Sequence, residues 1–299
     1  MPILKMFIQA LAIVALAPLI QGFIQWCKAR LQNRRGPAPW QPYLTLFKLL
    51  SKDLVIARTA SWITDFTPFV CFGAAFAVAG LIPFALDWAS GGIADLFLIV
   101  YLFALSRFAM SLAGLDAGNS FGGMGSSREM YLAVLVEPAF LLAILAAAGA
   151  GGSTELGAMA NAAVNHSFTL PYVLAAVAFF IVTIAECGRI PVDNPDTHLE
   201  LTMFQEALLI EYSGRHLALL QWSIYVRQLV MILLFVELFF PWTWMGLLPS
   251  EFFWTVGKIF LLGILMALTE TSTAKMRLFR LPNFLAASGL LSLLALVAR

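Results

Sequence analysis

Long apolar segments alternate with shorter polar ones along most of the chain. Eight segments approach or exceed the roughly 20 mainly apolar residues that a membrane-spanning helix needs. They cover about residues 3–26, 66–87, 93–115, 131–151, 170–188, 217–240, 252–271 and 281–298. This pattern predicts an all-α integral membrane protein with about eight transmembrane helices, in a single polytopic membrane domain that covers residues 1–299. Because so many spans follow, we interpret the first segment as a retained helix rather than a signal peptide.

The composition agrees with a membrane protein. Hydrophobic residues make up 61% of the chain, charged residues make up 12%, and the mean hydropathy is +0.87. Soluble domains contain about 45–50% apolar and about 25% charged residues. The formal net charge of +1, without a basic arm, argues against a nucleic-acid partner. The three cysteines are isolated from one another, so we predict neither a disulfide framework nor a metal site in this chain.

Basic residues are distributed unequally between the two sides of the predicted bundle. The polar segments after odd-numbered spans contain most of the lysines and arginines, whereas the opposite side has Lys5 and Arg299. By the positive-inside rule, both termini are expected on the non-cytoplasmic side. Arg34 and Arg35 form the basic cluster of the first inside loop, and apolar positions at helical spacing predict an amphipathic helix within residues 43–54. Arg34 and Arg35 either set the topology alone or also take part in binding.

A second inside loop is expected between the third and fourth spans, over residues 114–132 with the sequence GLDAGNSFGGMGSSREMYL. It contains no GxxxxGK pattern, so a phosphate-binding loop is rejected. Its glycines are expected to permit close approach of the backbone to a neighbouring chain.

The most polar part of the chain is residues 185–219, which we call the acidic segment. It carries two of the three histidines, His198 and His216, and six of the seventeen acidic residues: Glu186, Asp193, Asp196, Glu200, Glu206 and Glu211. Charged groups beside hydrocarbon are costly unless they pair or meet water, which makes them candidates for function. The alternative is a solvated loop between the fifth and sixth spans.

An acidic amphipathic helix is expected within this segment. Asn194 and Pro195 form a typical helix start, and Asp196 and Glu200 then fall on one helical face. The apolar stripe of this helix consists of Leu201, Phe204, Leu208 and Leu209. Helices that bind a membrane surface are normally basic, so we expect this acidic helix to dock on protein.

Further ionisable residues lie in or beside the apolar segments. Arg107 and Glu137 both have apolar flanks, and the others are Glu186, Arg227, Glu237, Lys258 and Glu270. They either pair within the bundle and extend toward its ends, or they form a chain of carboxylates and cations suited to proton movement.

Several motifs resemble one known family over nearly the whole length, the membrane-embedded heel subunit of respiratory complex I, the NADH:quinone oxidoreductase. These motifs are RRGPAPWQPYLTLFKLLSKD, AECGRIPVD, EYSG and AKMRLFRLP. The stretches GLDAGNSF, GSSRE and LVEP resemble its membrane-bound hydrogenase branch, which includes formate hydrogenlyase subunit 4 and hydrogenase-4 component C.

The resemblance implies roles for particular residues. By matching position, the acidic coupling cavity would contain Glu186, Arg189, Asp193, Asp196, Glu200 and Glu211. The predicted coupling region or proton path also includes Arg107, Glu137, His198 and Glu206, which are singled out from the sequence itself. Arm docking, or the entrance of a quinone site, would involve Arg34, Arg35, Arg277 and Arg280. The chain departs from the family pattern in the stretch PVDNPDTHLEL, where Asp196 replaces a glutamate and His198 stands where another carboxylate is usual. A histidine titrates near pH 6.5, so this stretch loses a fixed negative charge.

The resulting hypothesis is a non-catalytic subunit of a complex I-like, hydrogenase-4-type oxidoreductase in the cytoplasmic (inner) membrane. Such a chain docks a soluble electron-transfer arm, links redox chemistry to translocation of H⁺ or Na⁺, and contacts antiporter-like membrane subunits. Iron–sulfur clusters, with or without a nickel–iron centre, are expected in the partners and not in this chain. Two alternatives remain: a subunit with a quinone chamber, and a stand-alone ion transporter, against which the absence of inverted repeats argues.

Overall fold

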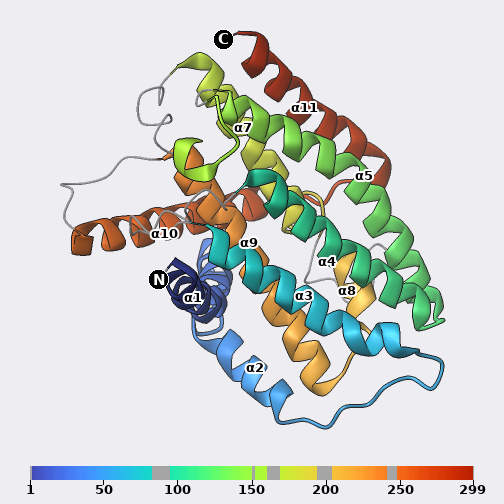
Figure 1. Cartoon of the computed structure of the whole chain (residues 1–299). Helices are drawn as coiled ribbons and strands as arrows, with labels where there is room; N and C mark the ends of the chain where they lie inside the picture. Colours follow the sequence, from blue (N-terminus) through green and yellow to red (C-terminus); the bar gives the residue numbers. More distant parts are fainter. Residues whose placement is uncertain are drawn as a thin grey trace.

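The computed structural model describes residues 2–82, 95–149, 152–159, 169–193, 204–240 and 248–298. Within these ranges the chain is helical and contains no β-strand, as predicted (Figure 1). The helices are α1 (Pro2–Leu31), α2 (Gln41–Leu50), α3 (Trp62–Leu81), α4 (Leu96–Asp116), α5 (Ser120–Ala148), α7 (Leu170–Glu186), α8 (Gln205–Leu209), α9 (Gly214–Phe239), α10 (Leu248–Ser272), the 3₁₀ turn η1 (Leu278–Arg280) and α11 (Leu281–Val297).

Each of the eight predicted apolar segments contains a helix. Seven helices in the described ranges are long and apolar enough to cross a membrane, which makes the chain a multi-pass membrane protein. The fifth predicted span corresponds to α7, an apolar helix of 17 residues that is not among these seven. A count of eight membrane crossings therefore stays a prediction.

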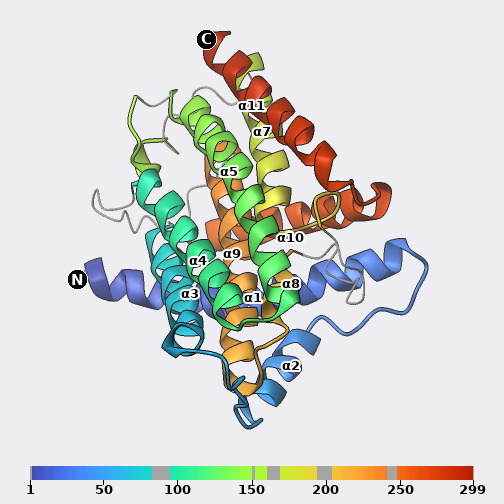
Figure 2. The same ribbon diagram turned by 90° about the vertical axis from the view of Figure 1, so that its right-hand side faces the viewer.

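Helix α9 lies at the centre of the molecule and packs against α1, α2, α3, α7 and α10 (Figures 1 and 2). Its interior position explains why it is apolar on nearly all sides, with a continuous buried run from Val226 to Val236. Helix α1 is seen end-on in Figure 1 and lies crosswise to α5, α7 and α9 in Figure 2. The ends of α1, α9 and α10 thereby meet beside the acidic segment, where the candidate site lies.

Two prolines within spanning helices leave backbone carbonyls that other parts of the chain satisfy. Pro18 in α1 has no N–H for the carbonyl of Val14, and the indole N–H of Trp222 in α9 donates to this oxygen at 2.9 Å. Pro68 in α3 similarly frees the carbonyl of Thr64, which accepts from the Tyr212 hydroxyl at 3.1 Å. Both bonds fix α9 and the residues before it against helices from the N-terminal part of the chain.

The prediction of a glycine-rich loop over residues 114–132 is mostly wrong, because α5 already begins at Ser120. The Asn119 side chain caps this helix by accepting from the Gly122 N–H at 2.5 Å, and only residues 117–119 separate α4 from α5. The glycines do allow close approach, but to other parts of this chain: Gly114 lies against Gly122, and Gly125 lies against Ala207 of α8. Close packing therefore outweighs the low helix propensity of glycine here.

Replacement of Gly122 by alanine is expected to lower the free energy of unfolding by about 1–3 kcal/mol, the usual cost of overpacking. Its Cβ would lie 2.4 Å from the Gly114 carbonyl oxygen, a backbone atom that cannot move aside. Gly123→Ala is the matched control, because its Cβ would meet nothing within 4 Å. The midpoint of thermal unfolding in one detergent checks both; equal midpoints would contradict the packing argument.

The predicted amphipathic helix of the first inside loop is confirmed as α2, which buries Pro42 and Leu46 against its neighbours. The following loop is tied to the start of α9, since the Ser213 hydroxyl bonds to both the N–H and the carbonyl of Val55 at 2.8 Å. Gly214 has a positive φ of 49° and lies so close to Asp53 that its missing Cβ is a requirement of this contact. The EYSG stretch thus attaches the start of α9 to the loop that follows α2.

Candidate functional site

A cavity of about 510 Å³, which we call the chamber, lies where α1, α8, α9 and α10 meet the acidic segment. Its charged lining residues are Lys28, Arg34, Arg35, Arg189, Asp193, Glu206 and Glu270. Five glutamines also line it: Gln21, Gln25, Gln32, Gln205 and Gln221. Arg34 and Arg35 are exposed, whereas Arg189 and Glu270 are buried, so the chamber leads from the surface into the protein.

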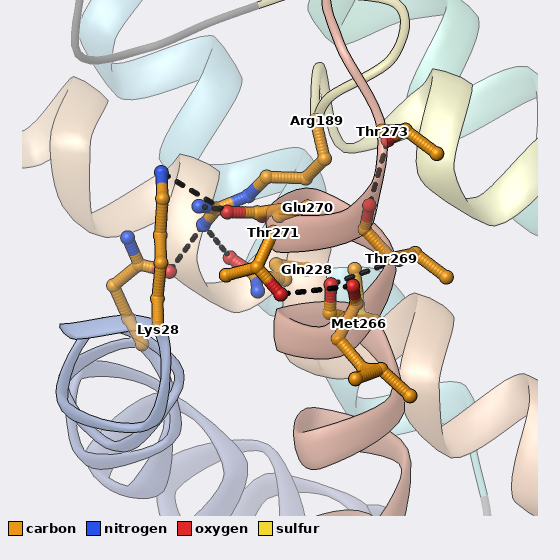
Figure 3. Close-up of polar contacts among 10 residues, drawn as sticks. Lys28, Arg189, Gln228, Met266, Thr269, Glu270, Thr271 and Thr273 are labelled. Atoms are coloured by element: carbon orange, nitrogen blue, oxygen red, sulfur yellow. Dashed lines mark hydrogen bonds and ion pairs between the residues drawn. The ribbon is translucent and has the colours of Figure 1, made fainter. Parts of the chain in front are cut away.

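Arg189 forms the buried end of the chamber together with side chains from three helices (Figure 3). Its guanidinium lies 3.3 Å from Oε1 of Glu270, which projects from the end of α10, and donates to Oε1 of Gln228 in α9 at 2.6 Å. It also donates to Gln21 of α1. The other oxygen of Glu270 lies 3.3 Å from Nζ of Lys28 in α1. Glu270 therefore joins two cations that come from different parts of the sequence.

Asp193 lies in the same wall and is almost completely buried. One carboxylate oxygen is 2.9 Å from Nζ of Lys275, and the other accepts from the backbone N–H of Phe204 at 3.0 Å. A buried carboxylate needs such partners, since burial without them is costly.

A second charged cluster lies deeper between the helices and surrounds Arg107 of α4. The Arg107 guanidinium forms an ion pair and hydrogen bond with Glu186 at the end of α7. It also lies 4.0 Å from Glu129 and 3.7 Å from Glu137, both in α5. Arg107, Glu129 and Glu186 are each at most 5% exposed, whereas the Glu137 side chain is 38% exposed. We call these four residues the Arg107 cluster.

The chamber and the Arg107 cluster are neighbours. A small cavity of about 20 Å³, enough for one water molecule, is lined by Arg107, Glu129 and Arg227. Gln205 of α8 lines both this cavity and the chamber. Gln205 and Ile224 are thus in the wall of both cavities, which places the chamber beside carboxylates in the interior of the bundle.

In the described parts of the chain, no group of three or more His, Cys, Asp or Glu side chains could hold a metal ion.

Comparisons with known proteins place the chain in a family. The family model described as NADH dehydrogenase matches residues 4–298. The chain belongs to the NADH dehydrogenase family. Formate hydrogenlyase subunit 4 of Escherichia coli K12 is 36% identical over 287 residues, which cover 93% of this chain and 92% of the relative. Hydrogenase-4 component C of the same organism is 35% identical and covers 90% of this chain and 87% of the relative.

More distant members of the family are also similar. A subunit of the NADH-quinone oxidoreductase of Cytophaga hutchinsonii is 29% identical over 285 residues, covering 80% of this chain and 77% of the relative. A chain in the structure of the membrane-bound sulfane sulfur reductase, an archaeal respiratory membrane complex, has a TM-score of 0.82. It is 21% identical, and the alignment covers 97% of this chain and 99% of that one, so the fold is shared along the whole length.

Many of the residues singled out from the sequence come together in this member of the NADH dehydrogenase family. The chamber contains Arg34, Arg35, Arg189, Asp193 and Glu206, and the deeper cluster contains Arg107, Glu137 and Glu186. The apolar stripe residues Phe204, Leu208 and Leu209 are buried against protein. Only Gln205–Leu209 is helical in the described part of the predicted acidic helix, and Phe204 precedes it outside the helix.

Other predicted residues lie elsewhere. Glu211 accepts a hydrogen bond from the side chain of Asn119, the residue before α5, and does not line the chamber. Arg277 and Arg280 are exposed beside η1 and do not line the chamber. Asp196, His198 and Glu200 lie outside the described residues.

Glu129 is a site residue that the sequence interpretation misses. It falls within the predicted glycine-rich loop, although its spacing of eight residues from Glu137 puts both on one face of a helix. The sequence identifies Lys28, Arg227 and Glu270 only as charges within or beside spans. Their site roles depend on contacts between distant segments, for which the sequence offers no local signal.

Proposed function

We propose that this chain is a non-catalytic subunit that docks the soluble arm of a complex I-like, hydrogenase-4-type oxidoreductase and couples its redox chemistry to proton translocation. The observation that carries the proposal is that the chamber lies beside the cavity at the Arg107 cluster, with Gln205 in the wall of both. Two curated relatives with high coverage, named as formate hydrogenlyase and hydrogenase-4 subunits, support the type of complex.

In this proposal exposed residues dock the arm, and interior residues carry the coupling. The exposed arginines Arg34, Arg35, Arg277 and Arg280 attract and orient the arm, whose partner subunits supply the iron–sulfur clusters and any nickel–iron centre. Both termini face the non-cytoplasmic side of the inner membrane.

The chamber transmits charge changes inward, and the Arg107 cluster holds the proton. Three carboxylates share Arg107, and Arg227 lines the adjacent cavity. The two buried carboxylates of the cluster, Glu129 and Glu186, depend on these two cations. A shift of either cation would favour uptake of a proton by the carboxylate that it leaves. Glu137, which is partly exposed, then passes the proton toward antiporter-like membrane subunits.

The chamber also supports a second candidate function, quinone binding. Its volume of about 510 Å³ lies within the usual range of ligand pockets, about 300–1,000 Å³. Its lining of glutamines and ion pairs is more polar than such pockets usually are, which favours the coupling role alone. Electron transfer that requires added quinone, and is lost when quinone is extracted from the membranes, would establish the second function.

The first test is to purify the complex in mild detergent through a tag on this chain, identify its subunits and measure its metals. We expect a soluble arm with iron–sulfur clusters and antiporter-like membrane subunits. Nickel together with iron would identify a hydrogenase partner, whereas iron alone would indicate another redox chemistry on the same scaffold. Recovery of the chain without partners would contradict the docking role.

The coupling role predicts a specific effect of Glu186→Gln and Glu129→Gln. Each change removes a protonatable group from the Arg107 cluster, so the number of protons moved per electron should fall. The ratio is measured in membrane vesicles with the electron donor and acceptor of the purified complex. Glu155→Gln is the control, because Glu155 lies outside the spanning helices and lines neither cavity. An unchanged ratio in both cluster variants would leave only the docking role.

A further inference from the structure

The beginning of the acidic segment is attached to the end of α10 by two ion pairs of opposite polarity. Arg189 pairs with Glu270 at 3.3 Å, and Asp193 pairs with Lys275 at 2.9 Å. Along the acidic segment the cation Arg189 precedes the anion Asp193. Along the end of α10 and the residues after it, the anion Glu270 precedes the cation Lys275. The same two segments are also joined by a backbone hydrogen bond of 2.8 Å, from the Met276 N–H to the Pro191 carbonyl. We call Arg189, Asp193, Glu270 and Lys275 the crossed clamp.

Asp193 also contacts Phe204, the next residue along the chain that the structure describes. Its carboxylate accepts from Phe204 N–H while it faces Lys275, so these two residues meet at one side chain. Arg189, Asp193 and Glu270 are all nearly inaccessible to solvent. Removal of one partner from a nearly buried ion pair is costly, so each charge depends strongly on the one opposite.

Three of the four clamp residues also line the chamber: Arg189, Asp193 and Glu270. Glu270 further contacts Lys28 of α1. Any change of charge in the chamber therefore acts on both ion pairs, and through them on α10 and the acidic segment together.

We infer that Glu270 and Lys275 are positioning residues that hold Arg189 and Asp193 in the coupling geometry. This inference rests on the proposed function. Lys275 acts through Asp193: it keeps the carboxylate oriented toward Phe204 N–H and so fixes the base of the acidic segment. Glu270 acts through Arg189, which would otherwise be held only by the uncharged oxygens of Gln21 and Gln228 and could shift within the chamber.

The test compares Lys275→Met, Asp193→Asn and the double variant in the purified complex. Each single variant should lower the number of protons moved per electron, and the double variant should be no worse than Asp193→Asn, because residues that act as a unit are not additive. Lys275→Arg should restore most of the ratio. Lys48→Met is the control, since Lys48 is exposed near the end of α2 and lines neither cavity.

A second measurement does not depend on turnover. In Lys275→Met, amide hydrogen exchange at residues 204–213 should become faster, because Asp193 no longer holds Phe204 N–H in a fixed place. A normal proton ratio and normal exchange in Lys275→Met, with a low ratio in Asp193→Asn, would overturn the positioning role and leave the proposed function intact. Additive losses in the double variant would also overturn it. A normal ratio in Asp193→Asn would instead count against the proposed function itself.

Discussion

Replacement of Arg107 by methionine is expected to prevent accumulation of a folded chain in the membrane. The change leaves Glu129 and Glu186 buried without the cation that both face. Removal of one partner from a buried ion pair costs about 3–5 kcal/mol, a large share of the total of about 5–15 kcal/mol that stabilises a typical protein. The amount of tagged chain that purifies with its partners measures the effect. Arg107→Lys should be intermediate, because an ammonium cannot contact three carboxylates as a planar guanidinium does.

If uncompensated charge causes the defect of Arg107→Met, removal of the two buried carboxylates should correct it. Addition of Glu129→Gln and Glu186→Gln removes the uncompensated charges, so accumulation should recover while proton translocation stays absent. Arg58→Met, in the exposed loop between α2 and α3, controls for the loss of an arginine as such. Wild-type amounts of the Arg107→Met chain, or no recovery in the triple variant, would show that packing rather than charge decides the stability of this region.

The second large effect is expected at Arg189, in the deep wall of the chamber. Arg189→Met removes contacts to Gln21, Gln228 and Glu270, which lie on three different helices. We expect the number of protons moved per electron to fall strongly. Electron transfer within the arm should continue, because its cofactors are expected in partner subunits. Simultaneous measurement of both rates in vesicles distinguishes uncoupling from inactivation.

Arg189→Lys serves as the conservative comparison for this prediction. It keeps one positive charge near Glu270 but loses the fixed geometry of the guanidinium. A partial loss of the proton ratio is expected. Tight coupling in Arg189→Met would mean that the chamber is not on the path, and the quinone role would then become its better explanation.

The sequence predicts the helices well because their signals are local. Long apolar runs predict the spans, and helical spacing predicts α2. Helix α5 begins earlier than expected for a tertiary reason: Gly122 and Gly125 are helical because their faces pack against Gly114 and Ala207. The intrinsic preference of glycine points the other way.

The site is predictable only in part. Arg189 and Asp193 are identified through their motif, and Arg107 through its position within an apolar run. Their partners are not evident from the sequence, since Lys275 lies 82 residues from Asp193 and the pairing depends on how α10 crosses the bundle. Gln205 carries no charge and belongs to no motif, yet it lies between the two cavities. Such a role follows from three-dimensional position alone.

The bond between Trp222 and Val14 has a consequence for the biogenesis of the chain. Helix α1 is synthesised first, yet its Val14 carbonyl lacks a hydrogen bond from Pro18 and receives one from a residue 208 positions later. An unpaired carbonyl in hydrocarbon is costly, so α1 reaches its lowest free energy only after α9 has been inserted beside it. Nascent chains that end before Trp222 should therefore remain incompletely packed and be favoured substrates of membrane proteases.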